Sequence, residues 1–146
     1  MANPIPFILL GLLLASPAVA APETIAVWKS ATCECSGNWV KHLQANGSAV
    51  KVNATEPGAL QRLKEQAGIG RKLASYPTAK IDGYVIEGHV PGTDIKRLIA
   101  EKPEAIGLAV PGMPVGSPGM EQGMTFEPYQ VLLLKKDGTS EVFATH

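Results

Sequence analysis

The sequence lacks the features that would place it in several common functional classes. Its 13 basic and 13 acidic residues cancel to a formal net charge of zero, so it lacks the basic surface by which proteins hold nucleic acid or an acidic membrane. No Ser-His-Asp spacing, glycine-rich phosphate loop or paired-carboxylate motif stands out. The composition therefore argues against a nucleic-acid-binding protein and offers no motif of a common hydrolase or nucleotide-binding enzyme.

Long hydrophobic runs are missing beyond the first twenty residues. Residues 1–20 read MANPIPFILLGLLLASPAVA, with an apolar core from Phe7 to Leu14 and a small-x-small ending at Ala18-Val19-Ala20. The apolar core is about half of the ~20 residues that a membrane-spanning helix needs, and the ending matches a signal-peptide cleavage site. We therefore expect residues 1–20 to be a cleaved signal peptide that exports a soluble mature chain, with no membrane segment left after cleavage.

Cysteine is also scarce, since the chain has two, Cys33 and Cys35, and they stand one residue apart in the segment TCECSGNW. Two cysteines do not make the disulfide framework of a small secreted protein. An oxidising compartment would oxidise an idle thiol pair, so this pair is either a disulfide or is protected by a bound ligand.

The remaining chain, residues 25–145, predicts one domain in which strands and helices alternate. Alternating β-branched residues, Asp-Gly turns and helix start and stop signals indicate the elements. They are strands at 25–29 and 48–55, a helix from Ser36 as N-cap to Ala45, a helix at 57–68, hairpins at 78–90 and 129–145, a helix at 91–103 capped by Thr93 or Asp94, and a Gly/Pro/Met loop at 107–128. This order predicts an α/β (α+β) fold with a mixed central sheet flanked by helices. Because the two cysteines stand at the first strand-to-helix junction, the layout suggests a thioredoxin-like domain.

The spacing of Cys33 and Cys35 favours a site for a soft metal ion. In an extended strand their side chains would point to opposite faces, but a turn into a helix lets them converge. Free N–H groups and the helix dipole at that end favour a thiolate. Two thiolates on a turn suit Cu(I), whereas a closed zinc site would need two more good ligands and no other cysteine exists.

Methionine and histidine add further candidate ligands. The loop segment VPGMPVGSPGMEQGM carries Met113, Met120 and Met124. Thioether sulfur is soft and needs no deprotonation, so Met113 and Met120, ahead of Met124, are candidate auxiliary Cu(I) ligands; the alternative is that these side chains fill gaps beneath the loop.

The three histidines are weaker candidates. We expect His42 on the solvent side of the first helix. We expect His89 at a strand end as a ligand or a structural hydrogen-bonding group, and His146 in a disordered terminus.

Three segments resemble a known family. CECSGNWVKHLQANG, LASYPTAKIDGYVIEGHVPGTDIKRLIAEKP and GLAVPGMPVGSPGME look like the CopG-type periplasmic copper-resistance proteins, over roughly residues 25–143. The resemblance implies a thioredoxin-like fold, Cu(I) bound by cysteine thiolates in a small cluster, and a role in periplasmic copper handling beside other copper-handling proteins, with copper redox chemistry as one option.

The sequence departs from the family pattern at the ligands. The family usually carries Cys-x-Cys-Cys, and here the third position is Ser36; it usually carries Cys-His where this chain has Tyr76-Pro77. Cys33 and Cys35 match the first two family ligands, whereas serine and tyrosine are poor Cu(I) ligands and proline has no side-chain donor. What remains suits one Cu(I) between two sulfurs, with a methionine, rather than a cluster.

Three functions follow from these observations. We favour a non-enzymatic copper-binding protein with Cys33 and Cys35 as ligands and Met113 or Met120 as auxiliaries. The second is a thiol-disulfide oxidoreductase in which Cys33 attacks and Cys35 resolves, opposite a cis-proline at Pro77. The third is a degenerate scaffold that binds no metal, with an inert disulfide and a surface that binds a protein partner.

Overall fold

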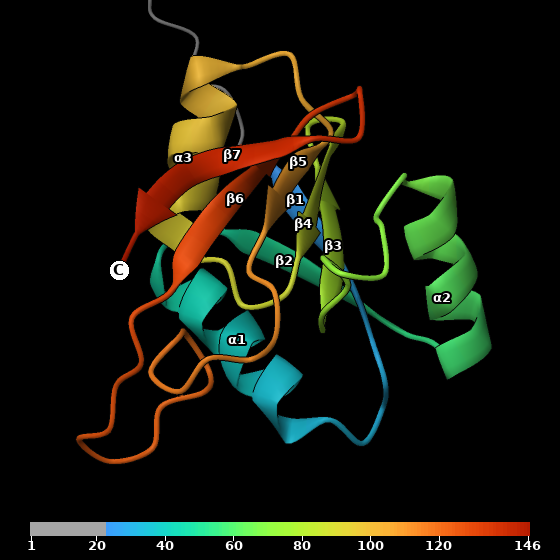
Figure 1. Cartoon of the computed structure of the whole chain (residues 1–146). Coiled ribbons are helices and arrows are strands. Elements are labelled where there is room, and N and C mark those ends of the chain that lie inside the picture. Colours follow the sequence, from blue (N-terminus) through green and yellow to red (C-terminus); the bar gives the residue numbers. More distant parts are fainter. Residues whose placement is uncertain (1–22) are drawn as a thin grey trace, which may run out of the picture.

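The computed structural model describes residues 23–146, so the predicted signal peptide at residues 1–20 lies outside the described residues. They form one seven-stranded sheet in the order β2-β1-β3-β4-β5-β6-β7, with three helices (Figure 1). The strands are β1 (Thr24–Lys29), β2 (Ala49–Ala54), β3 (Thr78–Ile81), β4 (Tyr84–Glu87), β5 (Gly107–Ala109), β6 (Gln130–Leu134) and β7 (Ser140–Thr145). The helices are α1 (Glu34–Ala45), α2 (Pro57–Gln66) and α3 (Gly92–Glu101). Among residues 23–146, no helix is long and apolar enough to cross a membrane.

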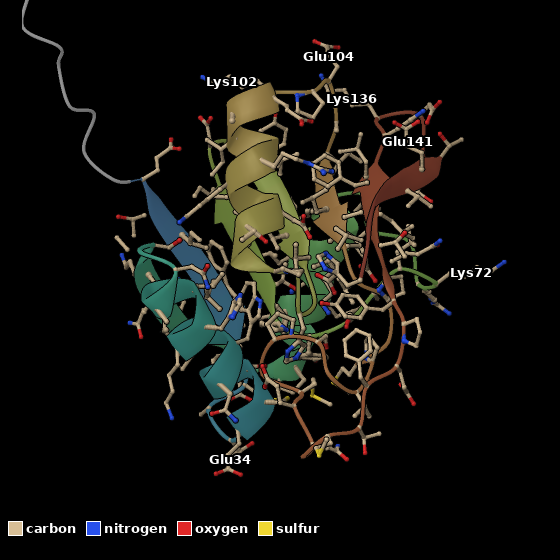
Figure 2. All side chains as sticks on the ribbon, turned by 90° about the vertical axis from the view of Figure 1, so that its left-hand side faces the viewer. Glu34, Lys72, Lys102, Glu104, Lys136 and Glu141 are labelled. Atoms are coloured by element: carbon tan, nitrogen blue, oxygen red, sulfur yellow. The ribbon has the colours of Figure 1, made fainter. Side chains whose placement is uncertain are left out.

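The sheet is mixed, as the sequence predicts. β1 pairs with β2 and β4 with β5 in parallel, and each of these pairs is joined by a helix, α1 or α3, because parallel neighbours need a crossover connection. The other neighbouring strands are antiparallel. α1 and α3 lie together on one face, in front of the sheet in Figure 2, and α2 lies on the other side (Figures 1 and 2). The predicted α+β fold with a mixed central sheet is confirmed.

The main core fills the space between the sheet and the pair α1 and α3. Trp39 and Leu43 of α1 pack there with Ile95 and Leu98 of α3, and each is at most 1% exposed. The indole N–H of Trp39 donates a hydrogen bond of 2.8 Å to the carbonyl oxygen of Val90. This bond satisfies the buried indole and ties α1 to the segment that follows β4.

Two predicted helix starts are wrong. α1 begins at Glu34 with Cys33 as its N-cap residue, and no side chain caps it; the Ser36 hydroxyl donates to the Cys33 sulfur instead. α3 begins at Gly92 after Pro91, also without a side-chain cap, because the carboxylate of Asp94 is bound to His146. Two predicted capping side chains are thus bound elsewhere: Ser36 to the neighbouring Cys33, and Asp94 to the distant His146.

One strand was not predicted. β5 (Gly107–Ala109) lies inside the segment that the sequence presents as a loop, and it pairs with β4 and β6 in the middle of the sheet. It has three residues and is completely buried, so it shows no alternation of polar and apolar side chains.

Candidate metal centre

The two thiols meet at the start of α1. β1 ends at Lys29, a short turn follows, and the chain enters the helix with Cys33 as N-cap residue and Cys35 in the first turn. The two Sγ atoms lie 2.8 Å apart and both cysteines are free thiols of intermediate exposure. The turn therefore brings the side chains to the same side, as the sequence predicts.

The two thiols differ in acidity. Burial raises the pKa of Cys33, but hydrogen bonds from Cys35 and from Ser36, together with the nearby charge of Lys29, outweigh it and leave this pKa below its ordinary value. Burial and the hydrogen bond to Cys33 both raise the pKa of Cys35. Cys33 is therefore the better thiolate, and Cys35 holds the proton that the pair shares.

The loop that carries the methionines packs against the first turn of α1. At Gly119, whose φ is +87°, an added Cβ would lie 2.6 Å from the Trp39 amide nitrogen and 2.9 Å from the Cys35 carbonyl oxygen. Only glycine fits this approach. Met120 is the next residue in the chain and is half-buried, so the structure places its backbone beside the turn that holds Cys35.

The other end of this loop, at Gly112, is bound to Ser75, in the segment before β3. The hydroxyl of Ser75 donates a hydrogen bond to the carbonyl of Gly112, and Met113 follows with 49% of its surface exposed. Met124, in contrast, is fully exposed. The loop thus runs between Ser75 and Cys35, with Met113 and Met120 next to its two attachment points, and their role as ligands stays a prediction.

Tyr76-Pro77 stands where the family usually has Cys-His, and its peptide bond is cis, which confirms the prediction for Pro77. Thr78 pairs with Trp28 in the β1–β3 ladder, so Pro77 lies level with Lys29, the last residue of β1. Tyr76-Pro77 therefore lies at the same end of the strands as the turn that leads from β1 to Cys33.

The histidines have structural partners. His89 is completely buried; its Nδ1–H donates to the Pro118 carbonyl at 2.7 Å, and its Nε2 has no hydrogen-bond partner. His42 was expected to face solvent, but it is half-buried because its Nε2 accepts the Gly92 N–H at 3.1 Å.

His146 is ordered rather than disordered. Its Nε2 lies 2.7 Å from the Asp94 carboxylate, and its ring stacks on Tyr129 with centroids 5.2 Å apart.

No group of three or more His, Cys, Asp or Glu side chains that could hold a metal ion occurs among residues 23–146. The oxygen and nitrogen ligands of a closed zinc site are therefore missing around the thiols in the described part of the chain. The donors that the structure brings together are the two thiol sulfurs, and soft sulfur donors suit Cu(I).

An open cavity of ≈ 260 Å³ adjoins Cys33. Its lining residues are Lys29, Ala31, Thr32, Cys33, Glu34, Gly37, Asn38 and Lys41. A larger hollow of ≈ 500 Å³ is lined by prolines, Tyr129 and β6 and contains neither cysteine. We place the chemistry at the smaller one, because it alone of these two includes a reactive group.

A buried ion pair between α2 and β4 was not predicted from the sequence. Lys64 of α2 and Glu87 of β4 lie 2.7 Å apart, with side chains 3% and 0% exposed. The signal that would have revealed it is the position of Lys64 four residues after the buried Leu60, on the apolar face of its helix.

Comparisons with known proteins identify the family. A family model described as "Protein of unknown function, DUF411" matches residues 73–120. A solved structure named "Copper resistance protein copG- Form 2" is 42% identical, with a TM-score of 0.80 over 86% of this chain and 99% of that chain. The chain belongs to the CopG family. The structure named "Copper resistance protein copG- Form 1" is 41% identical, with the same TM-score of 0.80, over 86% of this chain and 98% of that chain. No curated protein matches.

The comparisons confirm the family resemblance and the fold, because nearly the whole length of the CopG chains superposes on this one. They support a copper-related role for this CopG protein. The metal ligands of this chain are a separate question, because the family pattern and this sequence differ at Ser36 and at Tyr76-Pro77.

Proposed function

We propose that this CopG protein binds one Cu(I) ion between Cys33 and Cys35 and acts in periplasmic copper handling, after export by the signal peptide at residues 1–20. The observation that carries the proposal is the thiol pair itself, two sulfurs 2.8 Å apart at the start of α1, of which Cys33 has a lowered pKa. The protein acts as a binding protein, and the metal is its cargo.

The thiol pair needs only a small movement to hold one ion. Metal–thiolate bonds of roughly 2.3 Å at a tetrahedral or wider angle put two sulfurs about 3.8 Å or more apart, so the sulfurs separate by about 1 Å as the ion enters and the shared proton leaves. Cys33 and Cys35 are half-exposed, which leaves their side chains room to turn. Met113 and Met120 are the auxiliary ligands in this proposal.

A Cu(I) titration under reducing conditions, read by native mass spectrometry, tests the proposal. We expect one copper per wild-type chain and none in the Cys33→Ser/Cys35→Ser double variant. Met124→Leu is the control, because it changes a fully exposed side chain and leaves both thiols and Ser36 in place. No bound copper in the wild type, or equal binding by the double variant, would show the proposal to be wrong.

The unequal acidity of the thiols favours a second candidate, thiol-disulfide exchange. The Cys33 thiolate would attack a substrate disulfide, form a mixed disulfide and release one substrate thiolate. Cys35 would then lose its proton and attack the Cys33 sulfur, which releases the second substrate thiol and leaves a Cys33–Cys35 disulfide. A reduced protein that fails to reduce a small disulfide, while Cu(I) still binds, rules this candidate out.

The degenerate scaffold has its own distinguishing result. Cells whose only copy carries Cys33→Ser/Cys35→Ser would then tolerate copper as well as wild-type cells. Under the copper-binding proposal we expect the double variant to lower copper tolerance, whereas Ser36→Ala cells retain more of it because both ligands are intact.

A further inference from the structure

Lys64 and Glu87 form the best-buried charged contact among residues 23–146, and neither the copper site nor the core explains it. Lys64 is one of two buried side chains on α2, the other being Leu60. α2 lies on the side of the sheet opposite α1 and α3 (Figure 1). The ion pair therefore joins an outlying helix to the end of β4 in the interior of the protein.

Every partner of this ion pair belongs to one short segment, Ser75 to Thr78. Glu87 Oε1 accepts the Ser75 N–H at 2.6 Å, and Oε2 accepts the Thr78 hydroxyl at 2.7 Å. The Lys64 ammonium donates to the Ser75 carbonyl and lies 4.2 Å from the centre of the Tyr76 ring. The two charged groups thus hold the chain on both sides of Pro77.

The contacts are those of an ionised carboxylate. Burial raises the pKa of Glu87 above its ordinary value, and the contacts with Lys64, Ser75 and Thr78, which favour the charged form, oppose this rise only in part. Each of these three groups donates to the carboxylate and none accepts from it. A buried charge is tolerated only when it is paired and hydrogen-bonded in this way, so the geometry of the segment and the ionisation of the pair depend on each other.

Two contacts connect Ser75–Thr78 with the parts of the chain that carry the candidate ligands. Pro77 lies level with Lys29, at the end of β1 from which the chain turns toward Cys33. The Ser75 hydroxyl binds the Gly112 carbonyl, next to Met113. An added Cβ at Gly88, which follows Glu87, would lie 2.8 Å from the Ser75 oxygen, so Ser75 packs closely on the backbone just after β4.

We propose that Lys64 and Glu87 are positioning residues. The buried pair fixes Ser75–Thr78 and, through Ser75, the Gly112 end of the methionine loop (residues 110–124), whose Gly119 packs on the turn that holds Cys35. Its effect on copper affinity rests on the proposed function. Its effect on the exposure of the two thiols does not, because that effect exists in the metal-free protein.

The main test is the double variant Lys64→Met/Glu87→Leu, which removes both charges and keeps apolar bulk in the interior. Replacement of a buried pair by apolar residues often preserves stability. The control is Lys135→Met/Glu141→Leu, which removes an exposed ion pair. In Figure 2, Glu141 is at the opposite end of the molecule from Glu34, the residue between the two cysteines.

Two measurements are made on folded protein well below its melting temperature. The first is the rate of alkylation of Cys33 and Cys35 as a function of pH, without metal. The second is Cu(I) affinity in competition with a chelator. In the Lys64→Met/Glu87→Leu variant we expect severalfold faster alkylation, because the loop that packs on Cys35 at Gly119 loses its attachment to Ser75 at Gly112. We expect an affinity about tenfold weaker, at the low end of the losses known for residues that orient metal ligands indirectly. The control variant should match the wild type in both.

If the folded Lys64→Met/Glu87→Leu variant has the alkylation profile and Cu(I) affinity of the wild type, the proposal is wrong and the pair is a purely structural feature. If this variant fails to fold, Thr78→Val takes its place, because it removes one hydrogen bond to Glu87 and keeps the ion pair. Faster alkylation of Thr78→Val then supports the proposal, and an unchanged profile overturns it. If the wild type binds no Cu(I) but alkylation still responds, the positioning role stands and the proposed function fails.

Discussion

The hydroxyl group of Ser36 donates a hydrogen bond of 3.2 Å to the sulfur of Cys33. Ser36 is completely buried in the first turns of α1, at the position where the CopG pattern usually has a third cysteine. A serine hydroxyl is a poor Cu(I) ligand, but this one helps to lower the pKa of Cys33. Serine at this position therefore lacks a sulfur donor while it favours the thiolate form of its neighbour.

Ser36→Ala tests this relationship. Loss of the donor should raise the pKa of Cys33, because a hydrogen bond to the charged form favours it. The thiolate absorbance of the metal-free protein, followed against pH, should shift to higher pH, and alkylation of Cys33 at neutral pH should slow severalfold. An unchanged titration would assign the acidity of Cys33 to Cys35, Lys29 and the backbone N–H of residue 36, without the Ser36 hydroxyl.

Gly119 provides a second test, at the contact between the methionine loop and α1. In Gly119→Ala the new Cβ would meet the Trp39 and Cys35 backbone at 2.6 and 2.9 Å, in addition to the cost of a positive φ. We expect the free energy of unfolding in urea to fall by about 3 kcal/mol.

Gly123→Ala is the control for this change. Gly123 also has a positive φ, +58°, but an added Cβ would meet nothing within 4 Å. Its loss should be about 1 kcal/mol, the conformational part alone. Equal losses in the two variants would mean that the loop moves away from α1 without cost.

The elements with a clear period or turn signal were predictable from the sequence. The Asp82-Gly83 and Asp137-Gly138 hairpins and the buried face of α3 around Ile95 and Leu98 are where the pattern puts them. β5 was missed because a three-residue strand buried on both faces leaves no alternation to detect.

The candidate site was predictable only in part. The approach of Cys33 to Cys35 follows from their spacing and the turn. The partners of His146 and Lys64 lie 52 and 23 residues away in the sequence, and no local pattern encodes such contacts. A lysine on an apolar helix face shows that something unusual is buried there, but only the fold shows that its partner is Glu87.

Acid should destabilise the protein through His89. Burial lowers the pKa of this histidine, although the Pro118 carbonyl and the Glu121 charge oppose the shift. Because the folded pKa lies below the unfolded one, the unfolded chain binds more protons between the two values. The contribution of His89 to stability is thus complete above about pH 6.5 and is lost as the pH falls toward the folded pKa, by about 1.4 kcal/mol per pH unit between the two.

His89→Asn isolates this effect, because the amide keeps a donor for the Pro118 carbonyl and does not titrate. The free energy of unfolding, measured at pH 7 and pH 5, should fall less in the variant than in the wild type. If the two proteins lose the same stability, the acid sensitivity comes from other groups, such as His42, whose pKa burial also lowers.

Met120 should contribute to Cu(I) affinity if the methionine loop supplies an auxiliary ligand. Leucine has a similar volume and no sulfur, so Met120→Leu should weaken the affinity by about tenfold, equivalent to 1.4 kcal/mol. Met124→Leu, at a fully exposed position of the same loop, should bind copper as the wild type does. Equal affinities in both variants would limit the ligands to the two thiols, with or without Met113.

Copper affinity should rise with pH, because binding displaces the thiol protons. Below the pKa of Cys33 both thiols are protonated, and the logarithm of the association constant should rise by about two per pH unit. The lowered pKa of Cys33 and the raised pKa of Cys35 then give an interval in which one proton is released and the slope is about one. Cys35→Ser, which keeps a hydroxyl donor near Cys33, should show a slope of about one at low pH and none above the Cys33 pKa. A pH-independent affinity in the wild type would mean that copper is bound by the thioethers and not by the thiols.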